Sequence, residues 1–268
     1  MRSFGATAIG LATAMALVTT LCTCGGRLVP MPLEPVTDAD IILDRMQSRK
    51  ATFNALSVTA RMELYSKNGV AKGRVTLLVD RSGRLRADAW TPSSDLIASM
   101  KADRHTFDYF ERGADTCWSG IPCARNLDRV LPLGLSLVDA TAALFGFPPV
   151  LAPATPWSIR FDRTVGAYHL ACGLGDGARQ HLWVRDDGTP VRAEVIAING
   201  LVYRAEFGEF EGTRSLPRYV RFVTPRNDTD FTIRYRSWDL APDISDEDWV
   251  FECPQGLRTI PLPCEEEP

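Results

Sequence analysis

Apolar and polar residues alternate along most of the chain. The alternation is clear from Val58 to Leu64 and again from Val75 to Val79, and it is typical of strands with one buried face. The turn at residues 80–83 (DRSG) leads into LRADAW, so residues 57–90 predict a three-stranded antiparallel meander. Further strand-like runs lie at residues 96–102, 105–110, 158–163, 167–172, 181–185, 191–198, 201–207, 218–223 and 231–238. Together with the meander they predict about a dozen strands.

Two segments depart from this alternation and predict helices. Near the N-terminus, Thr37 with Asp40 resembles a capping box before a loosely helical apolar face, which predicts a helix of about four turns. The second segment, residues 131–153 (LPLGLSLVDATAALFGFPPVLAP), separates the two groups of strands and is almost wholly apolar. Ser136 and Asp139 make a second capping box there, and Gly146 with two prolines ends the helix. A helix that is hydrophobic on all sides must be covered on all sides.

The first residues are typical of an export signal. Residues 9–21 are uncharged and span only about a dozen residues, where a membrane-spanning helix needs roughly 20. Leu21 lies three residues before Cys24, which is the spacing of a bacterial lipobox, whereas Cys22 lacks a leucine at that spacing. We therefore expect a lipoprotein signal peptide at residues 1–23, lipidation of Cys24, and a flexible tether rich in glycine and proline at residues 24–36. The alternative is ordinary secretion with both cysteines lost in the leader.

Apart from Cys22 and Cys24, five cysteines remain, in a compartment expected to be oxidising. Cys117 and Cys123 enclose a Ser-Gly turn, and Cys253 and Cys264 enclose a proline-rich segment, so each pair is a hypothesis for a local disulfide. Cys172 would then stay buried as a small apolar residue. Spacing alone does not determine the pairing.

Charge and motifs argue against several classes of function. The net charge is −3, from 30 basic and 33 acidic residues, which offers no strongly basic face for nucleic acid. The histidines, His105, His169 and His181, lie in predicted strands, and HExxH, GxSxG, GxGxxG and P-loop motifs are absent from the sequence. The acidic residues 228–230 and 243–248 lack the spacing of a calcium loop. We predict no catalytic residue, no metal and no cofactor.

Arginines are frequent in the second half of the chain. Arg234 and Arg236 share one face of a predicted strand, and acidic residues are interspersed nearby, so we interpret these arginines as part of a solvated outer face. The alternative is a patch for lipid headgroups or an acidic partner. The arginines in question are Arg204, Arg214, Arg218, Arg221, Arg226, Arg234 and Arg236.

The layout resembles the LolA/LolB family of bacterial lipoprotein carriers and receptors, especially its lipid-anchored, LolB-like branch. The resemblance rests on the helix before Leu56, the meander TARMELYS, GRVTLLVD and GRLRADAW, the lid-like LSLVDATAALFG, and the late strands ending in DWVFECPQG. It covers residues 37–256 and leaves residues 257–268 as a C-terminal tail. It implies a mainly β fold: a half-open antiparallel β-barrel of about eleven strands, with an N-terminal helix and an inserted apolar lid helix.

The resemblance also implies a function. The chain would be a non-catalytic, periplasm-facing outer-membrane lipoprotein whose cavity binds acyl chains of lipoproteins or lipids, with a periplasmic carrier protein as a partner. The loop that passes lipid to the membrane in LolB-like proteins corresponds here to TPSSDL, where Leu96 is the one large apolar residue, so this loop departs from the family pattern. The alternative is an envelope sensor or assembly scaffold that binds a protein partner through the same fold. The residues expected to bind lipid, each of which plain core packing would also explain, are Met62, Leu64, Leu77, Trp90, Met100, Phe107, Leu137, Leu144 and Phe145.

Overall fold

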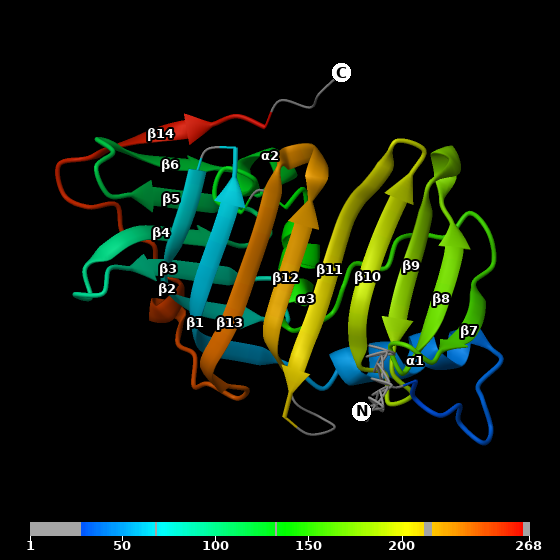
Figure 1. Cartoon of the computed structure of the whole chain (residues 1–268). Coiled ribbons are helices and arrows are strands. Elements are labelled where there is room, and N and C mark those ends of the chain that lie inside the picture. The colour runs from blue at the N-terminus through cyan, green and yellow to red at the C-terminus, as the bar shows by residue number, and fades with distance from the viewer. Residues whose placement is uncertain (1–27, 68, 132, 212–215, 265–268) are drawn as a thin grey trace, which may run out of the picture.

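The computed structural model of the chain describes residues 28–67, 69–131, 133–211 and 216–264. In this part of the chain one 14-stranded sheet has the order β14-β6-β5-β4-β3-β2-β1-β13-β12-β11-β10-β9-β8-β7. Neighbouring strands are antiparallel, except that β14 runs parallel to β6. β14 and β7 remain as edges, so the sheet bends around its core without closing (Figure 1). The mainly β, half-open fold is confirmed, with 14 strands where about eleven were expected.

The elements follow the predicted order along the chain. The strands are β1 (Ala55–Ser66), β2 (Gly69–Asp80), β3 (Leu85–Trp90), β4 (Leu96–Ala102), β5 (Phe107–Glu111), β6 (Thr116–Gly120), β7 (Ser158–Asp162), β8 (Ala167–Gly173), β9 (Arg179–Val184), β10 (Pro190–Ala197), β11 (Gly200–Phe210), β12 (Pro217–Thr224), β13 (Thr229–Asp239) and β14 (Arg258–Leu262). The helices are α1 (Ala39–Lys50), α2 (Ala124–Leu127) and α3 (Leu137–Leu144), with 3-10 turns η1 (Gly175–Gly177), η2 (Pro225–Asn227) and η3 (Asp246–Trp249). The alternating pattern did not predict β6 and β14, which are only five residues long each.

Pairing between β1 and β13 joins the early and late halves of the chain into one sheet. Along β1, the buried residues Leu56, Val58 and Ala60 face the core in alternation with less buried neighbours. They lie opposite the buried β2 residues Val79, Leu77 and Val75, respectively. The alternation of apolar and polar residues in the sequence therefore correctly predicts which side chains lie on the inner face of the sheet.

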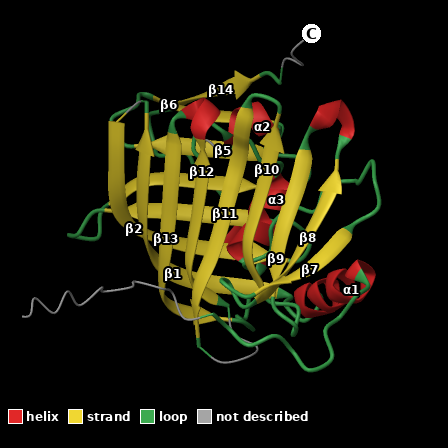
Figure 2. Cartoon of the chain, turned by 45° about the vertical axis from the view of Figure 1, so that its right-hand side comes forward, coloured by secondary structure: helices red, strands yellow, loops and turns green. Residues whose placement is uncertain are grey.

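Both predicted helices are present. Asp38, rather than Thr37, caps α1: its side chain accepts a hydrogen bond from the backbone N–H of Asp40. Ser136 caps α3 as expected, by accepting from the N–H of Asp139. Figure 2 shows α3 on the inner side of the sheet and α1 at one end of it, beside β7 to β9.

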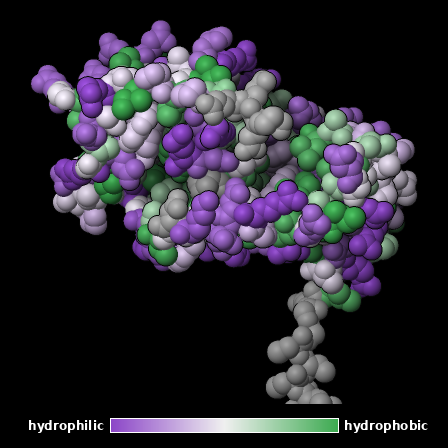
Figure 3. Space-filling model, turned by 90° about the horizontal axis from the view of Figure 1, so that it is seen from above, coloured by the Kyte–Doolittle hydropathy of each residue, from purple (hydrophilic) through white to green (hydrophobic). Residues whose placement is uncertain are grey.

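The hairpin tips between β1 and β2, β12 and β13, and β10 and β11 lie at one end of the sheet, and α1 lies at the other end. At the α1 end, Arg45 forms an ion pair with Asp186 in the β9–β10 turn, at 2.6 Å. Figure 3 shows the hairpin end from above, where hydrophilic and hydrophobic side chains are intermingled. We call the end of the sheet with these three hairpin tips the hairpin end, and the opposite end the α1 end.

Residues 28–36 were expected to be part of a flexible tether, but they lie against the α1 end of the sheet. The backbone N–H of Val29 donates to the carbonyl of Arg163 at 2.8 Å, and Arg163 Nε donates back to the carbonyl of Val29 at 3.2 Å. The N–H of Val36 donates to the Tyr168 hydroxyl at 3.0 Å. We call residues 28–36 the strap. The predicted signal peptide and Cys24 lie outside the described residues.

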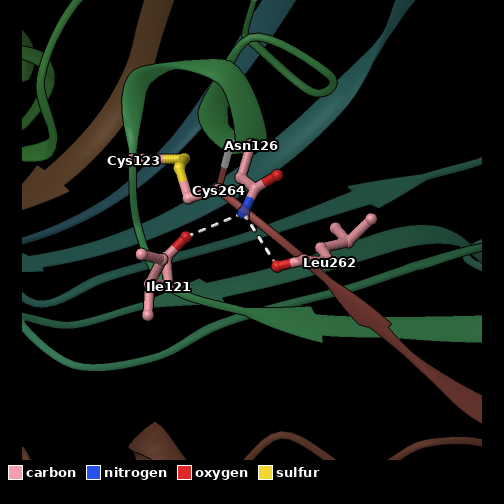
Figure 4. The surroundings of a disulfide bond; sticks show 5 residues. All are labelled: Ile121, Cys123, Asn126, Leu262 and Cys264. Carbon is pink, nitrogen blue, oxygen red and sulfur yellow. Dashed lines mark hydrogen bonds between the residues drawn. A yellow bond between two sulfur atoms is a disulfide. The ribbon is translucent and has the colours of Figure 1, made fainter. Parts of the chain in front are cut away.

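The expected local disulfides are wrong. Cys117 pairs with Cys253, and Cys123 pairs with Cys264. The physical reason is the parallel pairing of β14 with β6, which places the two ends of the C-terminal segment beside the two ends of the β6 segment. Figure 4 shows the second bridge, next to which Asn126 Nδ2 donates to the carbonyls of Ile121, at 2.9 Å, and Leu262, at 3.5 Å.

Part of the segment expected to be a C-terminal tail thus belongs to the sheet, because residues 258–262 form β14. Cys172 is buried and has no disulfide, and burial raises the pKa of its thiol.

Candidate functional site

A cavity of about 700 Å³ lies between the inner face of the sheet and the lid helix α3. Volumes of about 300–1,000 Å³ are usual for ligand pockets. Strands from both halves of the chain contribute to it, because β1 and β13 are neighbours in the sheet. The lid helix contributes Ala140, Ala143 and Leu144.

The interior of the cavity is mainly apolar, with Asp88, Ser99 and Thr229 as its buried polar residues. Leu77 and Leu85 from the early strands face Phe222, Phe231 and other buried side chains from the late ones. The small side chains of Ala140 and Ala143 leave room in front of α3, where larger residues would fill the space. The buried residues that line the cavity are Val75, Leu77, Leu85, Asp88, Ser99, Met100, Leu133, Ala140, Ala143, Leu144, Val220, Phe222, Thr229, Phe231 and Ile233.

The mouth of the cavity lies at the hairpin end and is polar. Lys67 and Asn227 come from two of the hairpin tips, Glu111 from the end of β5, and Asp128 and Arg129 from the segment after α2. Burial raises the pKa of the Asp128 carboxyl, which accepts a hydrogen bond from the N–H of Gly134 at 2.7 Å. An apolar interior with a polar rim suits an amphipathic ligand.

The lid helix is held in place by a buried hydrogen bond. The Tyr235 hydroxyl on β13 donates to the carbonyl of Leu144, at the last residue of α3, over 2.6 Å. Burial raises the pKa of Tyr235, so the hydroxyl remains a donor at neutral pH. Phe145, just after the helix, stacks on Phe53 with ring centroids 6.1 Å apart. Both contacts fix the C-terminal end of the lid helix.

Five of the nine residues expected to bind lipid line the cavity: Met62, Leu64, Leu77, Met100 and Leu144. The other four do not. Trp90 has the parity of Arg86, which does not line the cavity, and its indole N–H donates to Thr76 at 3.0 Å. Phe107, Leu137 and Phe145 are buried in the core away from the cavity.

The residues expected to bind lipid include none from the late strands, which also line the cavity. Val220 and Phe222 on β12, with Phe231 and Ile233 on β13, all line the cavity. The alternation in residues 218–223 and 231–238 marks these positions as inward-facing. That signal does not distinguish a cavity wall from a filled core.

Two histidines form a defined hydrogen-bonded pair on the other face of the sheet. Arg160 Nε donates to His169 Nδ1 at 3.0 Å, so the neutral His169 ring carries its proton on Nε2 and donates it to His181 Nδ1, 2.9 Å away. Burial, assisted by the charge of Arg160, lowers the pKa of His169 to about 4 and burial also lowers that of His181. His105 lies in the turn before β5, not in a strand. Among the described residues, no group of three or more His, Cys, Asp or Glu side chains could hold a metal ion.

Four of the arginines singled out in the late strands are paired with acids. Arg204 contacts Glu194 at 2.7 Å, and Arg221 contacts Asp230 at 2.6 Å. Arg218 pairs with Glu211 and Arg234 with Glu209. Arg214 lies outside the described residues. This pairing favours a solvated outer face over a headgroup-binding patch.

No helix in the described part of the chain has the length and apolar character needed to cross a membrane. The turn after Trp90, which corresponds to the membrane-passing loop of LolB-like proteins, is polar and internally bonded: Thr91 Oγ1 accepts from the N–H of Asp95 at 2.9 Å.

Comparisons with known proteins identify the fold. The chain is similar to a DUF1329 family protein from Desulfovibrio piger, with 14% identity and a TM-score of 0.53 over 79% of this chain and 95% of that one. It is also similar to a LolA superfamily protein from Nitrosomonas europaea, with 14% identity and a TM-score of 0.50 over 81% of this chain and 99% of that one. No protein-family model and no curated protein matches the chain. The LolA-like fold expected from the sequence is confirmed.

Proposed function

We propose that this LolA-like chain is a non-catalytic, lipid-anchored envelope lipoprotein that binds acyl chains of lipoproteins or lipids in its cavity and delivers them to the outer membrane. The anchor is a diacylglycerol-modified Cys24, and the folded body faces the periplasm. The observation that carries the proposal is the apolar cavity of about 700 Å³ beneath the lid helix. Each buried methylene contributes about 0.8 kcal/mol, so a single acyl chain gains enough from such a space to bind stably.

The cavity also argues against the alternative function, an envelope sensor or assembly scaffold. A scaffold needs only its outer surface, and its inner face can be filled by side chains. Here alanines of the lid helix face open space bounded by Leu77, Phe222 and Phe231. An unfilled apolar space behind a helix is costly unless a ligand occupies it, which favours lipid binding.

The experiment is a binding titration with a fluorescent fatty acid, comparing two substitutions on the lid helix. Ala143→Phe places a ring in the cavity, whereas Val138→Phe adds the same ring to a side of the helix where Val138 is 64% exposed. We expect loss of binding for Ala143→Phe and wild-type binding for Val138→Phe, with both proteins folded by circular dichroism. Absence of binding to the wild-type chain, or equal binding by both variants, would refute the cavity as the site.

A further inference from the structure

The size of the cavity limits how many acyl chains it can hold. A methylene group occupies roughly 30 Å³, close to the volume share of a water molecule in the liquid, so a palmitoyl chain needs about 500 Å³. The cavity of about 700 Å³ therefore has room for one such chain and for part of a headgroup. Two chains need about 1,000 Å³. A lipid or lipoprotein with a diacylglycerol group would leave at least one of its chains in water.

The charges around the mouth of the cavity place a second limit on the ligand. Lys67 and Arg129 supply two cations there. Glu111 and Asp128 supply two acids. Within the part of the chain that the structure describes, none of these four side chains forms an ion pair. Charges of both signs at the mouth are thus available to a ligand that itself carries both signs.

Neutral donors hold both acids in position. The Tyr109 hydroxyl donates to Glu111 Oε2 at 3.0 Å. Burial, together with the negative charge of Glu111, raises the pKa of Tyr109, so this hydroxyl keeps its proton and remains a donor. The backbone N–H of Gly134 donates to Asp128 Oδ1 at 2.7 Å. An ionised carboxylate has about four acceptor sites, so each acid can still accept hydrogen bonds from a ligand.

The four charges suit a phosphate linked to a primary amine. The guanidinium of Arg129 has paired N–H donors that match phosphate oxygens, and Lys67 adds a second positive charge. A primary ammonium group has three N–H donors for carboxylates. A quaternary ammonium group has none and binds instead to cages of aromatic rings, whereas the rings of Phe222 and Phe231 are buried in the interior of the cavity.

We infer that the ligand is a phospholipid with one acyl chain and a zwitterionic headgroup that ends in a primary amine, as in lysophosphatidylethanolamine. The acyl chain lies in the apolar interior beneath the lid helix. The phosphate lies beside Lys67 and Arg129, and the ammonium group lies beside Glu111 and Asp128. The inference rests on the proposed function, because it concerns the same cavity, and it adds the number of acyl chains and the chemistry of the headgroup.

The test is native mass spectrometry of the full-length protein with an equimolar mixture of three lysophospholipids. All three carry the same acyl chain, and their headgroups are ethanolamine, choline and glycerol. We expect one lysophospholipid per protein chain, with the ethanolamine form favoured about fivefold over each of the others, because partly exposed charge pairs contribute modestly to affinity. Dioleoyl phosphatidylethanolamine, which has the same headgroup but two chains, should not displace the lysophospholipid.

Three substitutions at exposed positions assign the headgroup contacts. Glu111→Gln should abolish the preference for ethanolamine over glycerol, because the amide has no negative charge. Arg129→Gln should weaken the binding of all three lysophospholipids, since all of them carry the phosphate, and should leave the binding of an uncharged fatty alcohol unchanged. Glu247→Gln removes an acid that does not line the cavity, and this matched control should keep the wild-type preference.

Several results would overturn the inference. They are equal occupancy by the three headgroups, displacement by dioleoyl phosphatidylethanolamine, an unchanged preference in Glu111→Gln, and undiminished lysophospholipid binding by Arg129→Gln. If the wild-type chain binds the fluorescent fatty acid but shows no headgroup preference, the inference fails while the proposed function stands. If it binds neither the fatty acid nor any lysophospholipid, both fail.

Discussion

The two disulfides join the same two segments of the chain, which predicts that their contributions to stability are not additive. Cys117–Cys253 closes a loop with a sequence separation of 136, and Cys123–Cys264 closes one of 141. The perturbation is removal of each bridge by paired cysteine-to-alanine substitutions, and then removal of both bridges together.

The magnitudes follow from the loop lengths. In the chain-entropy description, the first bridge to close a loop of this length stabilises the fold by about 5 kcal/mol. With that bridge in place, the other closes only the six residues from Cys117 to Cys123 together with the eleven from Cys253 to Cys264. A circuit of about 17 residues contributes about 3 kcal/mol. Loss of either bridge should therefore cost about 3 kcal/mol and loss of both about 8 kcal/mol, which exceeds the sum of the single losses by about 2 kcal/mol.

The assays are urea unfolding and thermal unfolding, each followed by circular dichroism, with the wild-type protein and the three variants at one pH. For a chain of this size, a loss of about 3 kcal/mol lowers the melting temperature by about 6–12 °C. If the bridges lay within each segment, each paired substitution would break both of them, and each loss would equal that of the variant without the four cysteines. Such equal losses, or disulfide-linked peptides joining Cys117 to Cys123 in an unreduced digest, would refute the pairing, and additive losses would refute the loop reasoning.

Three further predictions concern the core, the histidine pair and the α1 end. Tyr235→Phe should lower the free energy of unfolding by about 1–3 kcal/mol in chemical denaturation, because the buried carbonyl of Leu144 loses its donor; an unchanged midpoint would contradict this. The pKa of His169 is lowered in the folded state to about 4, so the unfolded chain binds this proton more readily, and stability should be full above about pH 6.5 and decline as the pH falls toward 4. Melting temperatures across this range should decline less for His169→Gln than for the wild-type chain, and parallel curves would count against the role of His169. Gly188→Ala should destabilise by at least about 1 kcal/mol in urea, because its φ is +79° and a Cβ would lie 2.6 Å from the backbone of α1; wild-type stability would show that the turn relaxes freely.

Most strands and both longer helices were predictable because the residue patterns that specify them lie within a few neighbouring positions of the sequence. Alternation from Val58 to Leu64 identifies both a strand and its inward face, and the capping serine at residue 136 marks the start of the lid helix. Pairing between β14 and β6 was not predictable in this way. Both strands are short, and their contact depends on residues that are more than 130 positions apart in the sequence.

The candidate site was predictable only in part. Parity along β2 separates Leu77, which lines the cavity, from Thr76, whose hydroxyl accepts a hydrogen bond from the Trp90 indole. Parity does not separate Phe107, which is packed in the core, from Phe222 and Phe231, which border open space. That difference depends on what lies opposite each side chain, and the small residues of the lid helix decide it.

The most direct test of lipid binding is native mass spectrometry of the protein extracted from membranes under mild conditions. We expect a mature chain that begins at an acylated Cys24 and carries a non-covalently bound acyl lipid, and we expect Ala143→Phe to lose the bound lipid while Val138→Phe retains it. A wild-type chain with no bound lipid, or with the same amount of lipid in both variants, would contradict the account.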